Sequence, residues 1–182
     1  QAQDINATFV VGKKKLEDAT IIQLPNEQPE SNWQRACFFA AKKSKFFIGA
    51  VRGAGRLTNF FQATGDYKNT LAALQGKEQF EYPATKKILT LCQELPDIMH
   101  CHNLHNKYFD LRELPYLSHT LPLILTLHDS WLLSGHCAYT KSCFRWQKGC
   151  GQCPDLSLYP AIRRDNTREN FIIKKNIYER SK

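Results

Sequence analysis

Two apolar stretches separated by a helix-length segment constrain the fold of this chain more than any other feature. The first, "PDIMHCHNLH" (96–105), is a short apolar run that ends in polar residues, and the second, "PLILTLHD" (122–129), is almost continuously apolar. A run of the second kind is typical of a parallel strand covered on both faces. The segment between them, "YFDLRELPYLSHTL" (108–121), is predicted to be a helix. Together they predict a right-handed strand–helix–strand crossover.

The other segments extend this unit to an α/β fold. Short β-branched runs at 7–15 and 19–24 predict two strands near the start. From Trp33 to Phe61, apolar residues recur every three or four positions, which predicts a mostly helical segment broken near 49–55. The segment 81–95 predicts another helix, with one apolar face formed by Ile88, Leu91, Cys92 and Leu95.

The chain ends in a predicted helix with an exposed basic side. Phe171, Lys175 and Tyr178 fall on one face of this helix, and Ile173 and Ile177 fall on an adjoining face. With 182 residues in all, the chain is long enough for one domain with a substantial core.

The composition indicates a folded chain with anionic partners. Hydrophobic residues make up 42% of the chain, and no apolar run approaches the ~20 residues that span a bilayer. The first residues lack a secretory signal pattern, so we expect reduced cysteines and a cytoplasmic location. The net charge of +8 favours phosphates, nucleic acid or an acidic membrane surface. Alternatively, balancing acidic residues lie outside a fragment, since the chain starts at Gln1 and Met99 is its only methionine.

Polar side chains follow both apolar stretches. The first stretch supplies His100, His102 and His105, and the second supplies His128, Asp129 and Trp131. Ligands of open parallel sheets bind outside the carboxyl ends of the strands. An imidazole at such an end can donate to a phosphate or sugar hydroxyl, or exchange a proton. We therefore predict functional roles for His128 and His102, whereas His100 is expected to face the core.

A metal-dependent hydrolase is an alternative for the same residues. A His-x-His pair after a strand begins the metal site of several metallohydrolases. Here His102 and His105 lack an adjacent carboxylate, so Asp129 would have to complete the site by proximity in the fold.

Four of the seven cysteines lie in a loop at 135–160. Cys137, Cys143, Cys150 and Cys153 follow the spacing C-x5-C-x6-C-x2-C, with glycines beside Cys150 that allow tight turns. The spacing fits a structural four-thiolate zinc site in part, and two disulfides or unligated thiols remain open. Four thiolates leave no open position on the ion, so catalytic zinc is not expected. The remaining cysteines are expected in the core: Cys37, Cys92 and Cys101.

The second half of the chain resembles a known enzyme family. The strings "PDIMHCHNLHNKYFDLRELPYLS", "PLILTLHDSWLLSGHCAY" and "C-x2-W-x3-GC-x2-CP-x5-YP" together resemble the N-terminal, acceptor-side domain of family 4 glycosyltransferases. The subgroup is one of bacterial polysaccharide-biosynthesis enzymes similar to colanic acid transferases. The close resemblance covers about 95–182, and the first half fits in the order of its elements only.

The resemblance implies a Rossmann-like domain over 1–182, as one half of a GT-B enzyme that transfers sugar from a nucleotide-sugar with retention and without a catalytic metal ion. It places His128 at the donor sugar and diphosphate. His102, Asn103 and His105 become candidates for acceptor or donor phosphate. Asp129 would orient a hydroxyl or the His128 imidazole, and Trp131 would stack on a sugar face.

The resemblance also implies parts that these residues lack. The first strand with its glycine-rich turn would precede the chain, and a C-terminal donor domain would follow it. We therefore expect weak acceptor binding and no turnover by this chain alone, whether it is a fragment or one subunit of a split enzyme. The expected partners are a nucleotide-sugar, a saccharide or lipid-linked acceptor, and the inner membrane face. Five cations are candidates for that membrane contact: Lys42, Lys43, Lys45, Arg52 and Arg56.

A binding module from another class competes with the enzyme. Its support is the charge of +8 together with basic and aromatic residues between the cysteines, namely Lys141, Arg145, Trp146 and Lys148. These would suit a zinc-bearing nucleic-acid-binding module. Nucleic acid is the less favoured partner, because the strands are strongly apolar and no nucleic-acid motif is present.

Overall fold

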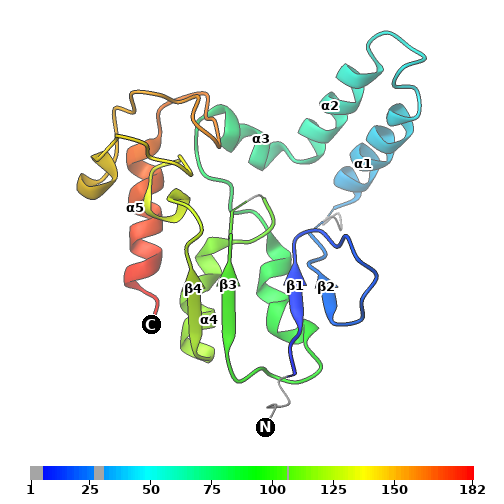
Figure 1. The fold of residues 1–182 in the computed structure, drawn as a ribbon. Helices are drawn as coiled ribbons and strands as arrows, with labels where there is room; N and C mark the ends of the chain where they lie inside the picture. The colour runs from blue at the N-terminus through cyan, green and yellow to red at the C-terminus, as the bar shows by residue number, and fades with distance from the viewer. Residues whose placement is uncertain (1–5, 27–30, 106) are drawn as a thin grey trace.

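The chain combines helices with short parallel strands (Figure 1). The structure, a computed structural model, describes residues 6–26, 31–105 and 107–182. The elements run in this order: β1 Phe9–Val11, β2 Ile21–Gln23, α1 Asn32–Lys45, α2 Ala54–Gly65, α3 Tyr67–Leu74, the 3-10 helix η1 Pro83–Leu91, β3 Met99–His102, η2 Leu111–Glu113, α4 Leu114–Thr120, β4 Leu123–Thr126, η3 Trp131–Leu133, η4 Arg145–Lys148 and α5 Thr167–Glu179. This order confirms the predicted mixture of helices and parallel strands.

The strands form two small parallel sheets. β1 pairs with β2, and β3 pairs with β4 in a register that sets Met99 opposite Leu123 and His102 opposite Thr126. The helix α4 connects β3 to β4, as predicted for the strand–helix–strand unit. Because the pair is parallel, the chain leaves both strands at the same edge of the sheet.

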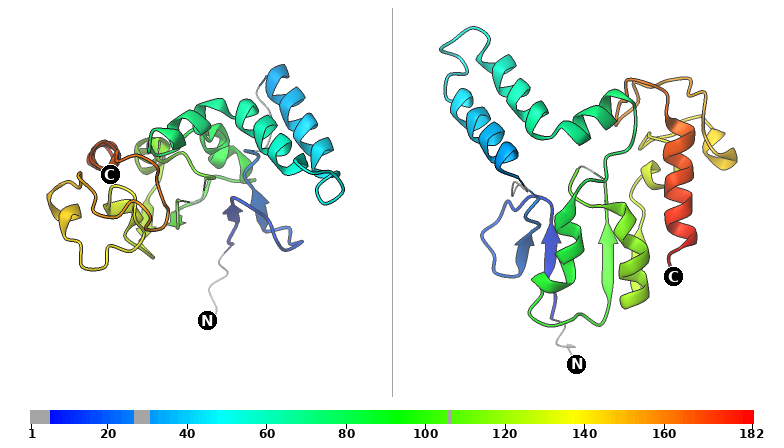
Figure 2. Two further views of the ribbon diagram at one scale, coloured as in Figure 1. Left: turned by 90° about the horizontal axis from the view of Figure 1, so that it is seen from above. Right: turned by 180° about the vertical axis from the view of Figure 1, so that it is seen from behind.

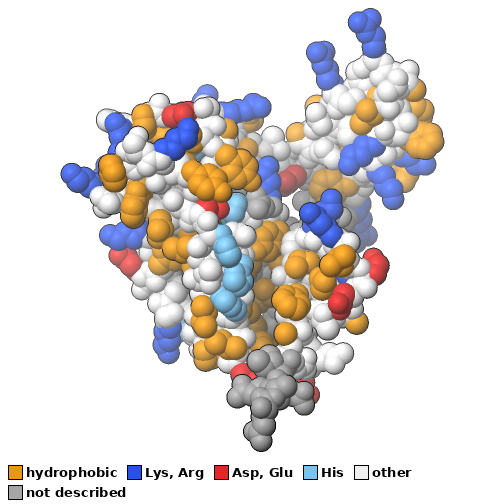
Figure 3. Space-filling model, viewed as in Figure 1, with side chains coloured by type: hydrophobic (Ala, Val, Ile, Leu, Met, Phe, Trp, Pro, Cys, Tyr) orange, Lys and Arg blue, Asp and Glu red, His pale blue; other side chains and the backbone are white. Residues whose placement is uncertain are grey.

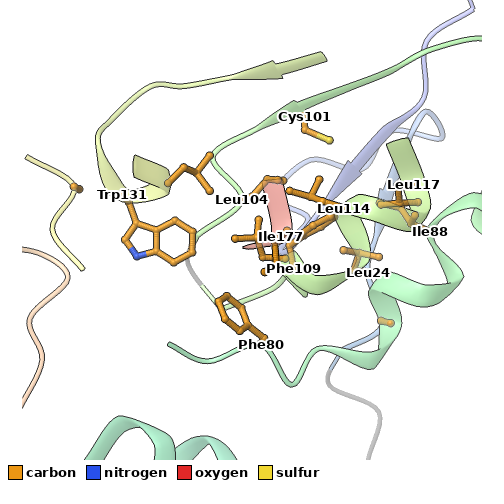
Figure 4. Packing of buried hydrophobic residues seen from close by; sticks show 14 residues of the cluster. Leu24, Phe80, Ile88, Cys101, Leu104, Phe109, Leu114, Leu117, Trp131 and Ile177 are labelled. Carbon is orange, nitrogen blue, oxygen red and sulfur yellow. The ribbon is translucent and has the colours of Figure 1, made fainter. Parts of the chain in front are cut away.

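The core lies between β3–β4 and the helices α4 and α5 (Figure 4). Leu111, Leu114 and Leu117 are almost fully buried, and Ile177 of α5 joins the same cluster. Cys101 of β3 is also buried, as predicted, and burial raises the pKa of its thiol to about 11. Alternate residues of β3 therefore point into this core, and the residues between them point away from it.

One face of the β3–β4 sheet is open, which corrects the prediction of cover on both faces. Leu123 and Leu125 of β4 pack against the core, whereas Ile124 between them is 48% exposed. His100, opposite Ile124, is also exposed, so the expectation that it faces the core is wrong. Apolar character alone concealed the alternation, because Ile124 is as apolar as its partly buried neighbours.

Two predicted helices differ in their details. The segment 81–95 forms the 3-10 helix η1, in which Ile88 is buried but Leu95, beyond its end, is 63% exposed. In α5, the inner face carries Asn170, Lys174 and Ile177, so a lysine expected on the basic side is buried. Burial of Asn170 is possible because its side-chain amide donates to the Gly76 carbonyl at 2.9 Å.

The helices α1 and α2 form a hairpin that projects away from the sheets (Figures 1 and 2). The predicted break falls at 46–53, between the two helices. Ser31 caps α1, because its hydroxyl accepts a hydrogen bond from the Gln34 amide at 3.1 Å. No helix within the described ranges is long and apolar enough to span a bilayer.

Candidate functional site

Three histidines form a row on the open face of the β3–β4 sheet. His100 and His102 alternate with buried Cys101 along β3, and His128 follows the end of β4. The ring centroids of His100 and His102 lie 4.0 Å apart, and those of His102 and His128 lie 5.1 Å apart. Figure 3 shows the histidines as a pale-blue stripe on the face seen in Figure 1. We call these three residues the histidine row.

Hydrogen bonds fix the row at both ends. His100 Nε2 lies 2.7 Å from the Thr126 hydroxyl across the sheet. His102 Nδ1 lies 2.8 Å from His128 Nε2, a distance that requires one ring nitrogen to donate and the other to accept. Desolvation and the neighbouring imidazoles of His100 and His128 lower the pKa of His102. The lowered pKa favours the neutral form of the His102 ring.

The backbone turns sharply at the end of β3, directly after His102. Asn103 adopts a left-handed conformation with φ of 45°, which asparagine tolerates better than most residues. The Tyr108 hydroxyl can donate to either of two carbonyl oxygens at this turn. It lies 3.2 Å from that of His102 and 3.1 Å from that of Asn103. The side chain of Asn103 is left exposed beside the histidine row.

A histidine–carboxylate pair lies next to the row. His105 Nε2 is 3.4 Å from Asp129 Oδ2, and both side chains are largely buried. The other carboxylate oxygen of Asp129 accepts from the Trp131 amide at 2.9 Å. Asp129 thus pairs with His105, and its expected role in orienting a hydroxyl or the His128 imidazole stays a prediction.

Trp131 belongs to the core. Its side chain is only 6% exposed, and its ring packs between His105 and the ammonium group of Lys174, which lies 4.2 Å from the ring centroid. A sugar-stacking platform needs an open ring face, so the expectation of stacking is not met here. Its ring instead packs beside His105, which pairs with Asp129.

A buried lysine ties the strand end to α5. Lys174 Nζ donates to the Trp131 carbonyl at 2.7 Å and forms an ion pair with Glu78 at 3.1 Å. Burial lowers the pKa of Lys174, and Glu78 counteracts this effect. The ion pair joins segments that are nearly a hundred residues apart, a contact that sequence periodicity does not reveal.

The four loop cysteines line one small cavity of about 20 Å³, which is about the size of a water molecule or an ion. The loop is fixed beside the strand end by a hydrogen bond from the Ser130 amide to the Ala138 carbonyl. The Gly135 amide donates to Cys150 Sγ at 3.2 Å, and the Asp165 carboxylate accepts from the Cys153 amide. All seven cysteines of the chain are free thiols in the structure.

His136 joins this cavity, which the sequence did not indicate. It is 2% exposed, its Nδ1 lies 3.1 Å from the Pro160 carbonyl, and its Nε2 lies 3.3 Å from Cys153 Sγ. Because a carbonyl only accepts, Nδ1 must carry the proton, and a neutral ring then directs the Nε2 lone pair at the sulfur. Among the described residues, no group of three or more His, Cys, Asp or Glu side chains is arranged to hold a metal ion.

One curated protein is similar to part of this chain. It is "Putative colanic acid biosynthesis glycosyl transferase WcaC" of Escherichia coli (strain K12), with 30% identity over 90 residues. The match covers 46% of this chain and 22% of that protein. No family model and no solved structure matches the chain. The similarity supports a relationship to glycosyltransferases.

The structure thus brings most of the predicted site residues to one edge of the sheet. His102 and His128 are in contact, Asn103 lies beside them, and His105 pairs with Asp129. It adds His100, which sequence analysis assigned to the core, and removes the ring of Trp131 from the surface. A strict period-two reading of "MHCHN" from the buried Cys101 would have placed His100 on the same face as His102.

Proposed function

We propose that this chain is the Rossmann-like, acceptor-side half of a GT-B glycosyltransferase, with its domain spanning 1–182. It would take part in transfer of a sugar from a nucleotide-sugar to a saccharide or lipid-linked acceptor, with retention of configuration. The similarity to the WcaC glycosyl transferase carries the proposal. The contact between His102 and His128 at the strand ends supports it, because this is where parallel sheets bind ligands.

In this reaction, the bond between the anomeric carbon and the diphosphate oxygen breaks, and a bond to an acceptor hydroxyl oxygen forms. The hydroxyl proton leaves with the departing diphosphate. His128 would donate a hydrogen bond to the donor sugar or diphosphate, and His102 and Asn103 would hold acceptor or phosphate oxygens. His105, paired with Asp129, would also contact acceptor or phosphate oxygens, and Asp129 would orient a hydroxyl. No catalytic metal ion is needed for these roles.

The remaining partners belong to the same proposal. A second, C-terminal domain would bind most of the nucleotide, and the enzyme would work in the cytoplasm with a peripheral contact at the inner membrane face. No observation on the described residues favours the metallohydrolase, since Asp129 pairs with His105 while His102 contacts His128. None favours the nucleic-acid-binding module either.

Structural zinc in the cysteine loop is also proposed. The shared cavity supports it, as does His136, whose Nδ1–H donates to the Pro160 carbonyl while its Nε2 lies against Cys153 Sγ. Metal-binding histidines commonly make such a carbonyl contact. The zinc would hold the loop rather than take part in transfer, because thiolate ligands would fill its coordination positions.

Histidine NMR tests the site on the chain itself. The ring C2 protons of His102 and His128 should shift on addition of saccharide acceptors or of uridine, guanosine and thymidine diphosphate sugars. His128→Asn should weaken the binding that is observed by about tenfold, the loss expected for one hydrogen bond to a charged group. No nucleoside diphosphate should be released by the chain alone.

His119→Asn is the matched control. His119 is an exposed histidine on α4 that hydrogen-bonds the Arg180 carbonyl, and its replacement should leave binding unchanged. Equal binding by the His128→Asn and unaltered chains would remove the histidine row as the site. Sugar transfer by the purified 182-residue chain would contradict the proposed need for a donor domain.

A further inference from the structure

The outer end of the α1–α2 hairpin exposes a run of large apolar side chains. Between the helices lie residues 46–53, which we call the tip. Phe46 is 88% exposed, and Phe47, Ile48 and Val51 are each more than half exposed. Single exposed apolar residues are common, but four within six positions form a patch that needs a partner.

The tip does not pack against its own hairpin. Along their length, α1 and α2 pack on each other, with the Ser44 and Thr58 hydroxyls 2.7 Å apart in the interface. Gly49 and Gly53 have left-handed backbone conformations, and no atom lies within 4 Å of the position that a Cβ of either would take. The tip is therefore an apolar projection rather than part of a groove (Figures 1 and 3).

Cations surround the tip and no acidic residue accompanies them. From Ser31 to Gly65 the chain has six basic residues and neither Asp nor Glu. All six are exposed, and five of them lie close to the tip in sequence. We call these five the collar: Lys42, Lys43, Lys45, Arg52 and Arg56. Lys43 Nζ lies 5.5 Å from the centroid of the Phe39 ring, so one collar cation covers an aromatic face.

This combination fits a lipid surface better than a protein. Lysine is depleted in protein interfaces, whereas apolar side chains beside Lys and Arg are typical of segments that lie in the headgroup region of a membrane. Each basic residue near an anionic lipid surface adds about 1 kcal/mol of attraction. Charge complementarity therefore selects an anionic bilayer as the occupant.

We propose that the hairpin docks this protein on anionic membranes. Phe46, Phe47, Ile48 and Val51 enter the headgroup region, and the collar cations bind lipid phosphates. The inference rests on the peripheral membrane contact within the proposed function and gives it a structural element. It does not depend on sugar transfer.

Vesicle sedimentation tests the docking with the 182-residue chain. The chain should sediment with vesicles of phosphatidylcholine and phosphatidylglycerol, and only weakly with phosphatidylcholine alone. Phe46→Ser with Phe47→Ser should weaken binding by at least about tenfold, from the apolar area lost. Replacing Lys42, Lys43 and Lys45 with Gln should weaken it on the order of a hundredfold. Added salt should weaken it further.

Matched variants lie outside the hairpin. Tyr139→Ser with Phe144→Ser removes two aromatic side chains that are each 67% exposed, and Lys86→Gln with Lys87→Gln removes two exposed lysines. Both should bind vesicles like the unaltered chain. Because the tip side chains are exposed, circular dichroism should show all variants folded.

A tryptophan at the tip reports insertion directly. The emission of Phe47→Trp should shift to shorter wavelength on anionic vesicles and be quenched by brominated lipid. Absence of vesicle binding at low salt would overturn the proposal. Equal vesicle binding by the tip variant and the unaltered chain would also overturn it. If the tip tryptophan stays unquenched and DNA displaces the vesicles, the hairpin is a nucleic-acid surface instead. His128→Asn should bind vesicles normally, so failure here and failure of the sugar-binding site are separate results.

Discussion

The contact between His102 and His128 gives two ring nitrogens a single shared proton. At 2.8 Å, Nδ1 of His102 and Nε2 of His128 cannot both carry protons without losing the hydrogen bond. His100 adds a third ring 4.0 Å from His102. Protonation of the middle ring therefore places a positive charge between two further imidazoles, which disfavour that charge.

The titration of His102 should reflect this arrangement. Desolvation and its two histidine neighbours lower its pKa below the ordinary 6.5. The unfolded chain then takes up this proton first, so the free energy of unfolding should fall as the pH drops through about 6.5 and level off below the folded-state pKa. His128→Ala should raise the NMR titration midpoint of His102, because it removes one neighbour and admits water.

His119→Ala serves as the control for this titration, since His119 contacts the Arg180 carbonyl and lies outside the row. The His102 midpoint should be the same in that variant as in the unaltered chain. A midpoint at or above 6.5 in the unaltered chain would contradict the lowered pKa.

The burial of several polar residues could not be predicted from the sequence. His136 and Lys174 are each buried to 2% exposure or less, although both residue types usually lie at the surface. Their burial depends on partners supplied by distant segments, the Pro160 carbonyl for His136 and Glu78 for Lys174. His102 and His128 could be singled out from the sequence, but the contact between them and the exposure of His100 required the register of β3 against β4.

At the scale of elements, the strand–helix–strand unit was predictable because its strands are strongly apolar and its helix carries regular leucines. Which face of β4 is covered was not predictable, since the sequence "LILTL" is apolar at positions facing either way. The same ambiguity affects α5, whose inner face includes Asn170 and Lys174. From the sequence alone, polar side chains of a helix are predicted to face solvent, because the partners that allow their burial lie in distant segments.

The docking of α5 depends on a close approach at Gly76. Asn170 donates to the Gly76 carbonyl and accepts from the Glu78 amide at 3.1 Å. Gly76 has φ of +73°, and a Cβ at this position would overlap the carbonyl of Arg164. Any larger residue would push apart the segment before η1 and the segment before α5.

We therefore expect Gly76→Ala to be strongly destabilising. The positive φ and the backbone overlap together should lower the free energy of unfolding by about 2 to 4 kcal/mol, measured by urea denaturation. Gly49→Ala is the matched control, because Gly49 also has a positive φ, +99°, but open space around it. That variant should lose only about 1 kcal/mol, and equal losses for the two would show that the overlap at Gly76 is relieved.

At the scale of the whole molecule, three features occupy separate parts of one chain. The histidine row lies on the open face of the β3–β4 sheet (Figure 3), the cysteine loop lies beside the end of β4, and the hairpin projects away from the sheets (Figure 1). Sequence periodicity located the hairpin helices but not the exposure of the tip, because a stripe of Phe47 and Val51 looks the same with or without a covering partner. The net charge and the spacing of the loop cysteines, by contrast, follow directly from the sequence.

The cysteine loop connects to the histidine row through the backbone. The Ser130 amide donates to the Ala138 carbonyl at 2.7 Å, just after Asp129, and Ala138 in turn donates to the Tyr159 carbonyl. A metal ion that fixes the loop would therefore also fix the strand end. Loss of that ion should change the surroundings of His128 although no loop cysteine contacts the row.

Metal analysis of the purified chain tests this coupling. Protein prepared without chelators should contain stoichiometric zinc, and its removal should lower the thermal midpoint by on the order of 10 °C and shift the NMR signals of His102 and His128. Cys150→Ser should abolish zinc binding with the same shifts, whereas Cys92→Ser, outside the loop, should retain the metal. Absence of zinc together with free reaction of all four loop thiols would mean that packing alone holds the loop. The row would then keep its NMR signals unchanged on chelator treatment, because its position would owe nothing to a metal.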